Sequence, residues 1–299
     1  MSVPSSHLGI WKRIIGLLGM LIALLFLQGC SAVKLAYNNV PELAYWWIDG
    51  YVDLSDAQSL RVREEVGRLH QWHRGTELPK IADLLQKIQR LASADTTPEQ
   101  ICGLFADARN RIDALITQAE PASVALAMTL GAAQLTHIEG KYAKANIEWR
   151  EEWSKGSDAE RLARRLKSSI ERSEQFYGNL EERQIAVLRN AISRSEFDPQ
   201  LSYAERLRRQ QDLLQTLRSI SAVAPRASVA QATSALRAYL DRSIQSPNPA
   251  YRAYSDRSIL DSCRSLAQLH NATTPEQRER ATRRLAAYER DARELAAQR

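Results

Sequence analysis

The stretch PASVALAMTLGAAQLTHIEGKYAKANIEWREEWS, residues 121–154, decides the fold class of this chain. Its apolar positions recur with alternating spacings of four and three residues, at Val124, Met128, Gly131, Leu135, Ile138, Tyr142, Ala145 and Trp149. This spacing places them on one face of an α-helix, where they can pack along a neighbouring helix. The pattern predicts one unbroken helix of about seven turns. We therefore expect an all-α protein.

The remainder of the chain shows the same helical periodicity between short breaks. Only 12 Gly and 10 Pro occur in 299 residues, which argues against many short strands joined by tight turns. We expect an elongated multi-helix bundle of antiparallel helices joined by short loops, with a single domain over residues 54–299. Breaks are expected at Pro41 and at residues 75–79, 94–97, 120–121, 156–157, 178–179, 198–199, 224–225, 246–249 and 271–274.

Several helix starts carry the same signature, a Ser or Thr followed three residues later by Gln. In this capping box the hydroxyl accepts from the backbone of the Gln, whose side chain returns to the backbone N–H of the cap. The signature occurs in LSDAQ (54–58) and in two copies of TTPEQ (96–100 and 273–277). LGAAQ (130–134) and LEERQ (180–184) are weaker matches. The first of these lies inside the long apolar stripe, where it need not start a helix.

Residues 1–29 have the three parts of a secretory signal peptide. Lys12 and Arg13 precede the uncharged apolar run IIGLLGMLIALLFL (14–27), which is shorter than the roughly 20 residues of a membrane-spanning helix. LQGC (27–30) follows and resembles a bacterial lipobox, in which the Cys receives a diacylglycerol and becomes the first mature residue. We expect Cys30 to be lipidated. The alternative is an uncleaved anchor with an incidental Cys.

The residue after the predicted lipidation site indicates which membrane would hold the protein. Acyl chains on Cys30 would hold the protein stably to a bilayer. Ser31 stands where lipoproteins of this type retained at the inner membrane have Asp, so the resemblance implies the periplasmic face of the outer membrane. Membrane lipid is thus one expected partner, and an unidentified envelope protein or component is another.

Residues 30–53 are expected to form a lipidated tether with an aromatic docking segment. Tyr45, Trp46, Trp47 and Tyr51 could form a belt at the membrane interface, where amphipathic aromatic rings are favoured. However, an apolar helix face is also formed here, by Leu43, Trp46, Trp47 and Gly50. Packing of this face onto the bundle is the preferred interpretation.

Cys102 and Cys263 would be the two thiols left after lipidation. Because the periplasm is oxidising, the simplest expectation is a disulfide, which would close a loop of about 160 residues. Cys263 falls on an apolar stripe with Ile259 and Leu266, and Cys102 lies beside another, so a helix-to-helix bond is reasonable. Two unrelated buried thiols are the alternative.

His70 and His73 are the one local histidine pair, and their spacing puts both imidazoles on one helix face. Two nitrogens do not complete a metal site, and the nearby Glu64, Glu65 and Glu77 fit no standard zinc signature. We expect partly exposed helix residues, and neither a metal nor another cofactor.

The segment NIEWREEW (146–153) sets three glutamates, Glu148, Glu151 and Glu152, beside two tryptophans, a combination also found in glycan-cleaving enzymes. Here, however, Trp149 ends the packing stripe, and the neighbouring basic residues can pair with the glutamates. The chain has no GxSxG, SxxK, HExxH or P-loop motif. We expect a protein that is not an enzyme and has no evident small-molecule substrate; a peptidoglycan hydrolase is the least favoured alternative.

Charge gives little sign of nucleic-acid binding. The chain has 41 Lys and Arg against 35 Asp and Glu, a net charge of +6. Basic and acidic residues interleave over 161–172 and 278–293, which is typical of solvated helix faces. Nucleic acid is therefore not an expected partner, because binding it needs clustered positive charge.

Several segments together resemble an uncharacterised family of proteobacterial all-helical lipoproteins, known only as a domain of unknown function. The matching segments are YNN…YWWIDGYVDLSDAQ (37–58), WHRGTELP (72–79), TTPEQIC (96–102), GKYAKANIEWREEW (140–153) and RRQQDLLQTLR (208–218). The resemblance covers nearly the whole mature chain. It implies a lipidated helical periplasmic protein and supplies no catalytic residues.

A second likeness concerns the helix starts. LSDAQ (54–58) resembles the LTxxQ motif of small helical periplasmic stress chaperones, with Ser in place of Thr, whereas both TTPEQ copies lack the Leu. The capping box explains all three segments without a chaperone. The sequence thus favours a non-enzymatic helical scaffold or binding module of the cell envelope, with a periplasmic chaperone as the alternative.

Overall fold

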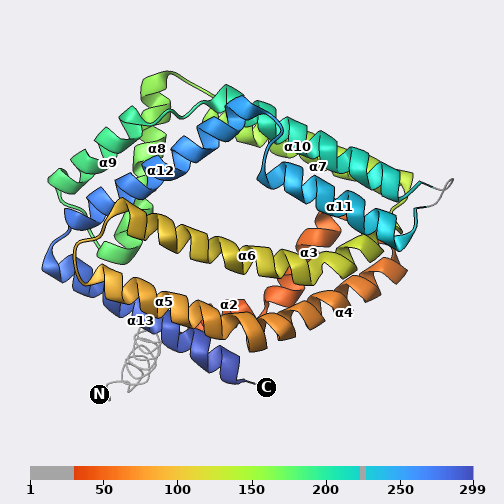
Figure 1. Ribbon diagram of the computed structural model, residues 1–299, viewed down its shortest axis with the longest axis horizontal. Helices are drawn as coiled ribbons and strands as arrows, with labels where there is room; N and C mark the ends of the chain where they lie inside the picture. Colours follow the sequence, from red (N-terminus) through yellow and green to blue (C-terminus); the bar gives the residue numbers. More distant parts are fainter. Residues whose placement is uncertain (1–29, 223–226, 299) are drawn as a thin grey trace, which may run out of the picture.

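The computed structural model describes residues 30–222 and 227–298, with side chains from residue 33 onward, and this part of the chain is α-helical without strands. The expected all-α bundle with short connections is confirmed (Figure 1). The expected signal peptide, residues 1–29, lies outside the described residues. The elements are α2 (Cys30–Asn38), α3 (Val40–Val52), α4 (Asp56–Trp72), the π-helix η1 (His73–Glu77), α5 (Leu78–Ala92), α6 (Pro98–Ala127), α7 (Ala132–Trp153), α8 (Asp158–Tyr177), α9 (Glu182–Arg194), α10 (Pro199–Ile220), α11 (Val229–Ile244), α12 (Pro249–Asn271) and α13 (Pro275–Ala297).

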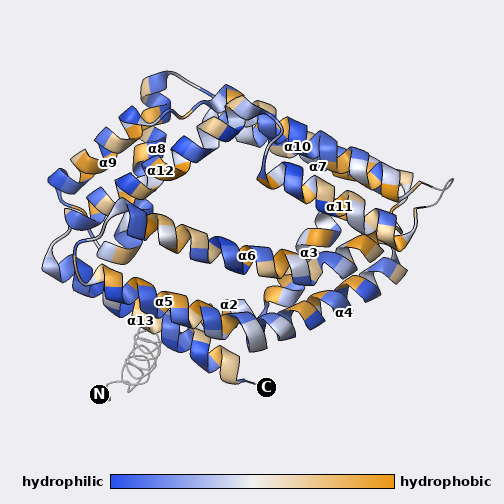
Figure 2. Ribbon diagram, viewed as in Figure 1, coloured by the Kyte–Doolittle hydropathy of each residue, from blue (hydrophilic) through white to orange (hydrophobic). Residues whose placement is uncertain are grey.

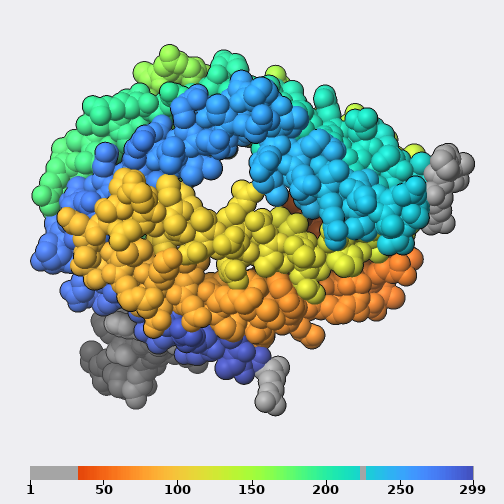
Figure 3. Space-filling view, viewed as in Figure 1, coloured from red at the N-terminus to blue at the C-terminus, as the bar shows by residue number. Residues whose placement is uncertain are grey.

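The helices are arranged as a ring. Neighbours along the chain pack side by side, as α3 does with α4, α8 with α9 and α10 with α11. Helix α6 contacts both α11 and α12, and α13 lies along α5. In the space-filling view, an opening remains between α6, drawn in yellow, and the blue and cyan surface of α12 and α11 (Figure 3).

Apolar residues, drawn in orange in Figure 2, gather where helices face one another. The larger core joins the end of α6 to α7, α10 and α11 through Val124, Ala127, Leu130, Leu135, Ile138, Leu214, Leu217, Ile220, Ala232 and Leu236. A smaller core joins α5 to α13 through Leu78, Ala82, Ala292 and Leu295. Burial of these side chains stabilises the ring, at roughly 25 cal/mol for each Å² of apolar surface removed from water.

The long stripe over residues 121–154 is not one helix, and that prediction is wrong. Helix α6 ends at Ala127, and α7 begins at Ala132 after a turn. The Gln134 side chain accepts from the backbone N–H of Gly131 at 3.0 Å, so LGAAQ does start a helix. The apolar spacing continues across the turn because Leu130 and Leu135 enter the same core.

Two expected breaks are also absent. Helix α6 continues through Pro121, which lies in its interior, and the buried Val124 and Ala127 anchor the turn that follows. At residues 75–79 the chain stays helical and forms the π-helix η1 between α4 and α5. The wider π turn accommodates Pro79, which has no backbone N–H to donate.

The remaining breaks lie where the sequence predicts them, except that the one at residues 224–225 lies outside the described residues. The capping boxes are confirmed for Gln58, Gln100 and Gln277, each of which accepts from the backbone N–H of its own cap. LEERQ also starts a helix, because Gln184 accepts from the N–H of Glu181 at 2.9 Å.

The aromatic segment packs only in part. Tyr45 is buried and lies beneath the Arg63 guanidinium, 3.5 Å from the ring centroid. Trp46 and Trp47 are 59% and 66% exposed, and Leu43 is 60% exposed. The expectation that these three side chains pack onto the bundle is therefore wrong. Helix α3 is held instead by its opposite face, which carries Tyr45.

Candidate functional site

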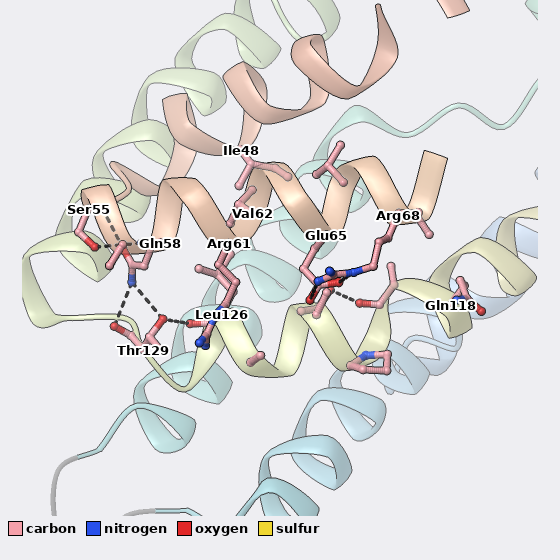
Figure 4. Close-up of a pocket in the computed structure, with 18 residues that line it drawn as sticks. Ile48, Ser55, Gln58, Arg61, Val62, Glu65, Arg68, Gln118, Leu126 and Thr129 are labelled. Atoms are coloured by element: carbon pink, nitrogen blue, oxygen red, sulfur yellow. Dashed lines mark hydrogen bonds and ion pairs between the residues drawn. The ribbon is translucent and has the colours of Figure 1, made fainter. Parts of the chain in front are cut away.

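A groove with a volume of about 560 Å³ runs between α4 and α6 (Figure 4). One wall is a single face of α4, and the other is the C-terminal half of α6, with Ile48 of α3 behind them. The lining residues are Ile48, Ser55, Ala57, Gln58, Arg61, Val62, Glu65, Val66, Arg68, Leu69, Gln118, Ala119, Pro121, Ala122, Ser123, Ala125, Leu126 and Thr129. The volume falls in the range of small-molecule sites.

Small side chains create the space. Helix α6 presents Ala119, Ala122 and Ala125 to the groove, at helical spacings of three residues. Across from them, α4 presents the larger Val62 and Val66. Because an alanine side chain ends at Cβ, the two backbones can lie next to each other and still leave an apolar trough.

A hydrogen-bonded cluster closes one end of the groove. Gln58, at the start of α4, donates through Nε2 to the backbone oxygen and to Oγ1 of Thr129, both at 3.1 Å. Gln58 and Gln134 also exchange amide hydrogen bonds. The cluster thus ties the first turn of α4 to the turn between α6 and α7, and so fixes the distance between the walls.

Charged side chains lie along the rim. Arg68 is paired with Glu65 one turn earlier, and that hydrogen bond raises the pKa of the Arg68 guanidinium. Arg61 is exposed, and none of the ion pairs among the described residues includes it. Its guanidinium extends across the groove toward α6, near Leu126 and Thr129 (Figure 4). The rim therefore offers one uncompensated positive charge above apolar walls.

The histidine pair is used to hold α2. His70 Nε2 lies 3.1 Å from the backbone oxygen of Tyr37, and His73 Nδ1 lies 3.0 Å from the hydroxyl of the same tyrosine. Burial lowers the pKa of both imidazoles. No group of three or more metal-ligating side chains occurs within the described ranges. The contacts explain both histidines as docking residues for α2.

The glutamates of the NIEWREEW segment lie on the outer face of α7. Glu148, Glu151 and Glu152 are exposed, and Glu151 pairs with Lys155. Trp149 stacks on Tyr203 of α10, with ring centroids 5.4 Å apart. The tryptophan thus contributes to helix packing, as expected from its position at the end of the apolar stripe.

Cys102 of α6 and Cys263 of α12 form a disulfide, with their Cα atoms 5.5 Å apart. Cys263 is buried, but Ile259 and Leu266 are 48% and 43% exposed, so the stripe assigned to that helix is wrong. The buried face of α12 follows Cys263 with Ala267 and His270 instead. Helix α2 begins at Cys30, the predicted lipidation site, whose side chain lies outside the described part.

All lining residues of the groove except Ile48 lie within the segment that matches a protein family. Residues 50–228 match the family described as "Family of unknown function (DUF6279)", and this match covers more than half of the chain. The chain belongs to the DUF6279 family. The expected membership of a family known only as a domain of unknown function is thereby confirmed. No curated protein and no solved structure matches the chain significantly.

The DUF6279 segment includes α4 and α6, and hence both walls of the groove. The sequence did not indicate this groove, because most of its lining residues belong to no motif and LSDAQ (54–58) was interpreted only as a helix start. One usable signal was present: Ala119, Ala122 and Ala125 put three small side chains on one face of a helix that is otherwise amphipathic. Small residues in such a row let another chain approach the helix closely.

Proposed function

We propose that this protein is a lipid-anchored, non-enzymatic binding module of the bacterial cell envelope, with the α4–α6 groove as its binding site. The observation that carries the proposal is the groove itself. Its walls are mainly apolar, and its polar groups lie at the rim and the closed end. Apolar walls with a few placed polar groups are typical of sites that hold a ligand.

A membrane location is supported by the exposed face of α3. Leu43, Trp46 and Trp47 lie on one side of this helix and point away from the bundle. They follow the proposed lipidation site, Cys30, by fewer than twenty residues. Exposed indole rings are favoured at the boundary between bilayer and water. Among the described residues, no helix is both long and apolar enough to cross a bilayer.

Helix α2 connects the proposed anchor to the body. Lys34 lies 3.4 Å from the buried carboxylate of Asp291 and also pairs with Glu294, both on α13. Together with the bonds from Tyr37 to the two histidines, these contacts hold α2 against the ring. A short, docked connection would keep the groove close to the membrane and raise its effective concentration for ligands there.

The anchor is tested by metabolic labelling with palmitate. Wild-type protein should take up label and fractionate with outer membranes, facing the periplasm. The Cys30→Ala variant should remain unlabelled. Palmitate label on the Cys30→Ala variant would refute lipidation at Cys30.

The groove is tested by filling it. Ala122→Trp places an indole in the trough, and Ala106→Trp places the same group on an exposed position of α6 outside the groove. Each protein is purified from membranes with a detergent that has no acyl chain, extracted with organic solvent and analysed by mass spectrometry. We expect a molecule that co-purifies with wild type and Ala106→Trp to be depleted at least fivefold in Ala122→Trp. Identical extracts from all three would refute binding in the groove.

A further inference from the structure

We infer that the groove binds a single-chain anionic amphiphile, that is, one acyl chain carrying a carboxylate or phosphate headgroup. This inference rests on the proposed function, because it requires the groove to be a binding site. The acyl chain would lie along Val62, Val66 and Ala122, and the headgroup would meet Arg61. The length of the groove, the small side chains of its wall and its charge each support this assignment.

The length of the groove matches an acyl chain. On α4 its lining extends from Ala57 to Leu69, which is about 18 Å along a helix. The hydrocarbon core of a bilayer is about 30 Å thick, so one acyl chain of a membrane lipid spans about 15 Å. An extended chain can therefore lie in the groove from end to end.

The walls of the groove suit an unbranched chain. The groove has a volume of about 560 Å³. An extended hydrocarbon chain fits this space because it carries no side groups, and the row of Ala119, Ala122 and Ala125 gives it a smooth wall.

The positive charge at the rim of the groove favours an anionic headgroup. The Arg61 guanidinium crosses the rim without an acidic partner in the described part of the chain, while Arg68 is neutralised by Glu65. A carboxylate or a phosphate would form charge-assisted hydrogen bonds with Arg61, whereas an uncharged headgroup would not.

The test uses the full-length protein in isolated cell envelopes. Palmitate carrying a diazirine is added, the sample is irradiated, and labelled peptides are mapped by mass spectrometry. We expect label within residues 57–69 and 118–129 of the wild type and of Ala106→Trp. The label should fall at least tenfold in Ala122→Trp. Equal labelling of all three proteins, or labelling spread over the whole surface, would overturn the inference.

Competition between unlabelled amphiphiles and the photolabel then tests which headgroup the groove binds. Unlabelled palmitate and a lysophospholipid of the same chain length should each remove the label, and the more effective one identifies the natural source of the anion. Hexadecanol, which has the chain without the charge, should compete roughly tenfold less well. Equal competition by hexadecanol would overturn the inference that the headgroup is anionic.

Two variants isolate the role of Arg61. Arg61→Gln should weaken palmitate competition by roughly tenfold, because one charge-assisted contact is lost. Arg63→Gln is the matched control, since Arg63 lies on the same helix but bonds Glu42 outside the groove. An equal effect of the two substitutions would overturn the assignment of Arg61.

The extraction experiment separates this inference from the function on which it rests. If Ala122→Trp loses a co-purifying sugar or peptide and palmitate does not label the groove, the groove binds a ligand, but that ligand is not an anionic amphiphile. If neither a co-purifying molecule nor label depends on position 122, both proposals fail. Labelling that depends on position 122 supports both.

Discussion

Gln58 and Gln134 bond to each other through their side-chain amides in both directions. Gln58 Nε2 lies 3.3 Å from Gln134 Oε1, and Gln134 Nε2 lies 2.7 Å from Gln58 Oε1. Each Nε2 also donates to a backbone oxygen five residues before its partner, at Thr129 and at Asp53. Because each Oε1 also accepts from the N–H of its own cap, two helix starts are joined by one set of bonds.

The same arrangement recurs in the other half of the ring. Gln184 and Gln277 exchange amide bonds at 2.6 and 3.0 Å. Each again donates to a backbone oxygen five residues before its partner, at Ala272 and at Asn179. The glutamine that recurs at these helix starts therefore has a structural role, which is to join pairs of helix starts that lie far apart in the chain.

Removing one of these amides should destabilise the fold by an amount that depends on burial. Gln184 is fully buried, so Gln184→Ala leaves several buried groups unpaired and should cost about 3 kcal/mol of unfolding free energy. Gln58→Ala, at a partly exposed pair, should cost about 1 kcal/mol. Urea denaturation measures both.

Gln231 provides the control for the glutamine pairs. It accepts from the backbone N–H of Ser228, but within the described residues its side chain has no bond to another helix. Gln231→Ala should therefore cost about 0.5 kcal/mol, the contribution of a cap. A cost for Gln184→Ala no larger than this would show that the cross-helix bonds contribute nothing to stability.

The disulfide between Cys102 and Cys263 should contribute strongly to stability. It joins α6 to α12 across 161 residues of sequence, and closing a loop of this size restricts the unfolded chain. Replacing both cysteines by serine should lower the unfolding free energy by about 4 kcal/mol. Calorimetry with and without a reductant measures the loss. The prediction fails if mass spectrometry finds both thiols free in protein purified from cells.

Local chemistry decided which features the sequence could predict. A capping box lies within five residues, with a proline after Thr97 and Thr274, so the starts at Ser55, Thr97 and Thr274 could be identified directly. The turn before Ala132 could not, because the apolar spacing runs across it without interruption. Both helices adjoining the turn bury that stripe in one core, so periodicity alone does not reveal where one helix ends.

The groove and the exposed tryptophans depend on packing between distant elements. A trough between α4 and α6 exists only because small side chains on one helix face larger ones on another. No single segment encodes that space. Likewise, Trp46 and Trp47 have the spacing of a buried face, and only the position of α4 decides that Tyr45 is buried in their place.

Stability should fall as the pH drops below about 6.5, the ordinary pKa of histidine. His270 is buried; its Nε2 donates to the backbone oxygen of Ala94, and its Nδ1 accepts from the Tyr177 hydroxyl. Burial lowers the pKa of its imidazole, so at mildly acidic pH the unfolded chain binds a proton that the folded chain does not. Unfolding is therefore favoured as pH falls, and the stability is restored above that pH.

His270→Gln tests the origin of this pH dependence. Glutamine keeps hydrogen-bonding groups but does not titrate, so the variant should lose less stability than wild type between pH 7.5 and pH 5.5. The slope should not vanish, because burial also lowers the pKa of His70 and His73. Urea denaturation at the two pH values measures the difference. An unchanged slope in His270→Gln would assign the effect to other groups.

The α3 tryptophans should contact lipid when the full-length, acylated protein is reconstituted in vesicles. Trp46 and Trp47 are exposed on one side of the helix that follows the proposed anchor, so the indoles can reach the membrane interface. Lipids brominated near the headgroup should quench their fluorescence. Trp46→Phe/Trp47→Phe should lose most of this quenching. Its unfolding free energy should fall by less than about 1 kcal/mol, because both side chains are exposed.

Trp149→Phe is the control, since Trp149 stacks on Tyr203 between helices and its removal should leave the lipid-dependent quenching intact. Quenching that persists in the double variant would place the α3 face away from the membrane, because the indoles then reporting lipid contact would belong to other helices.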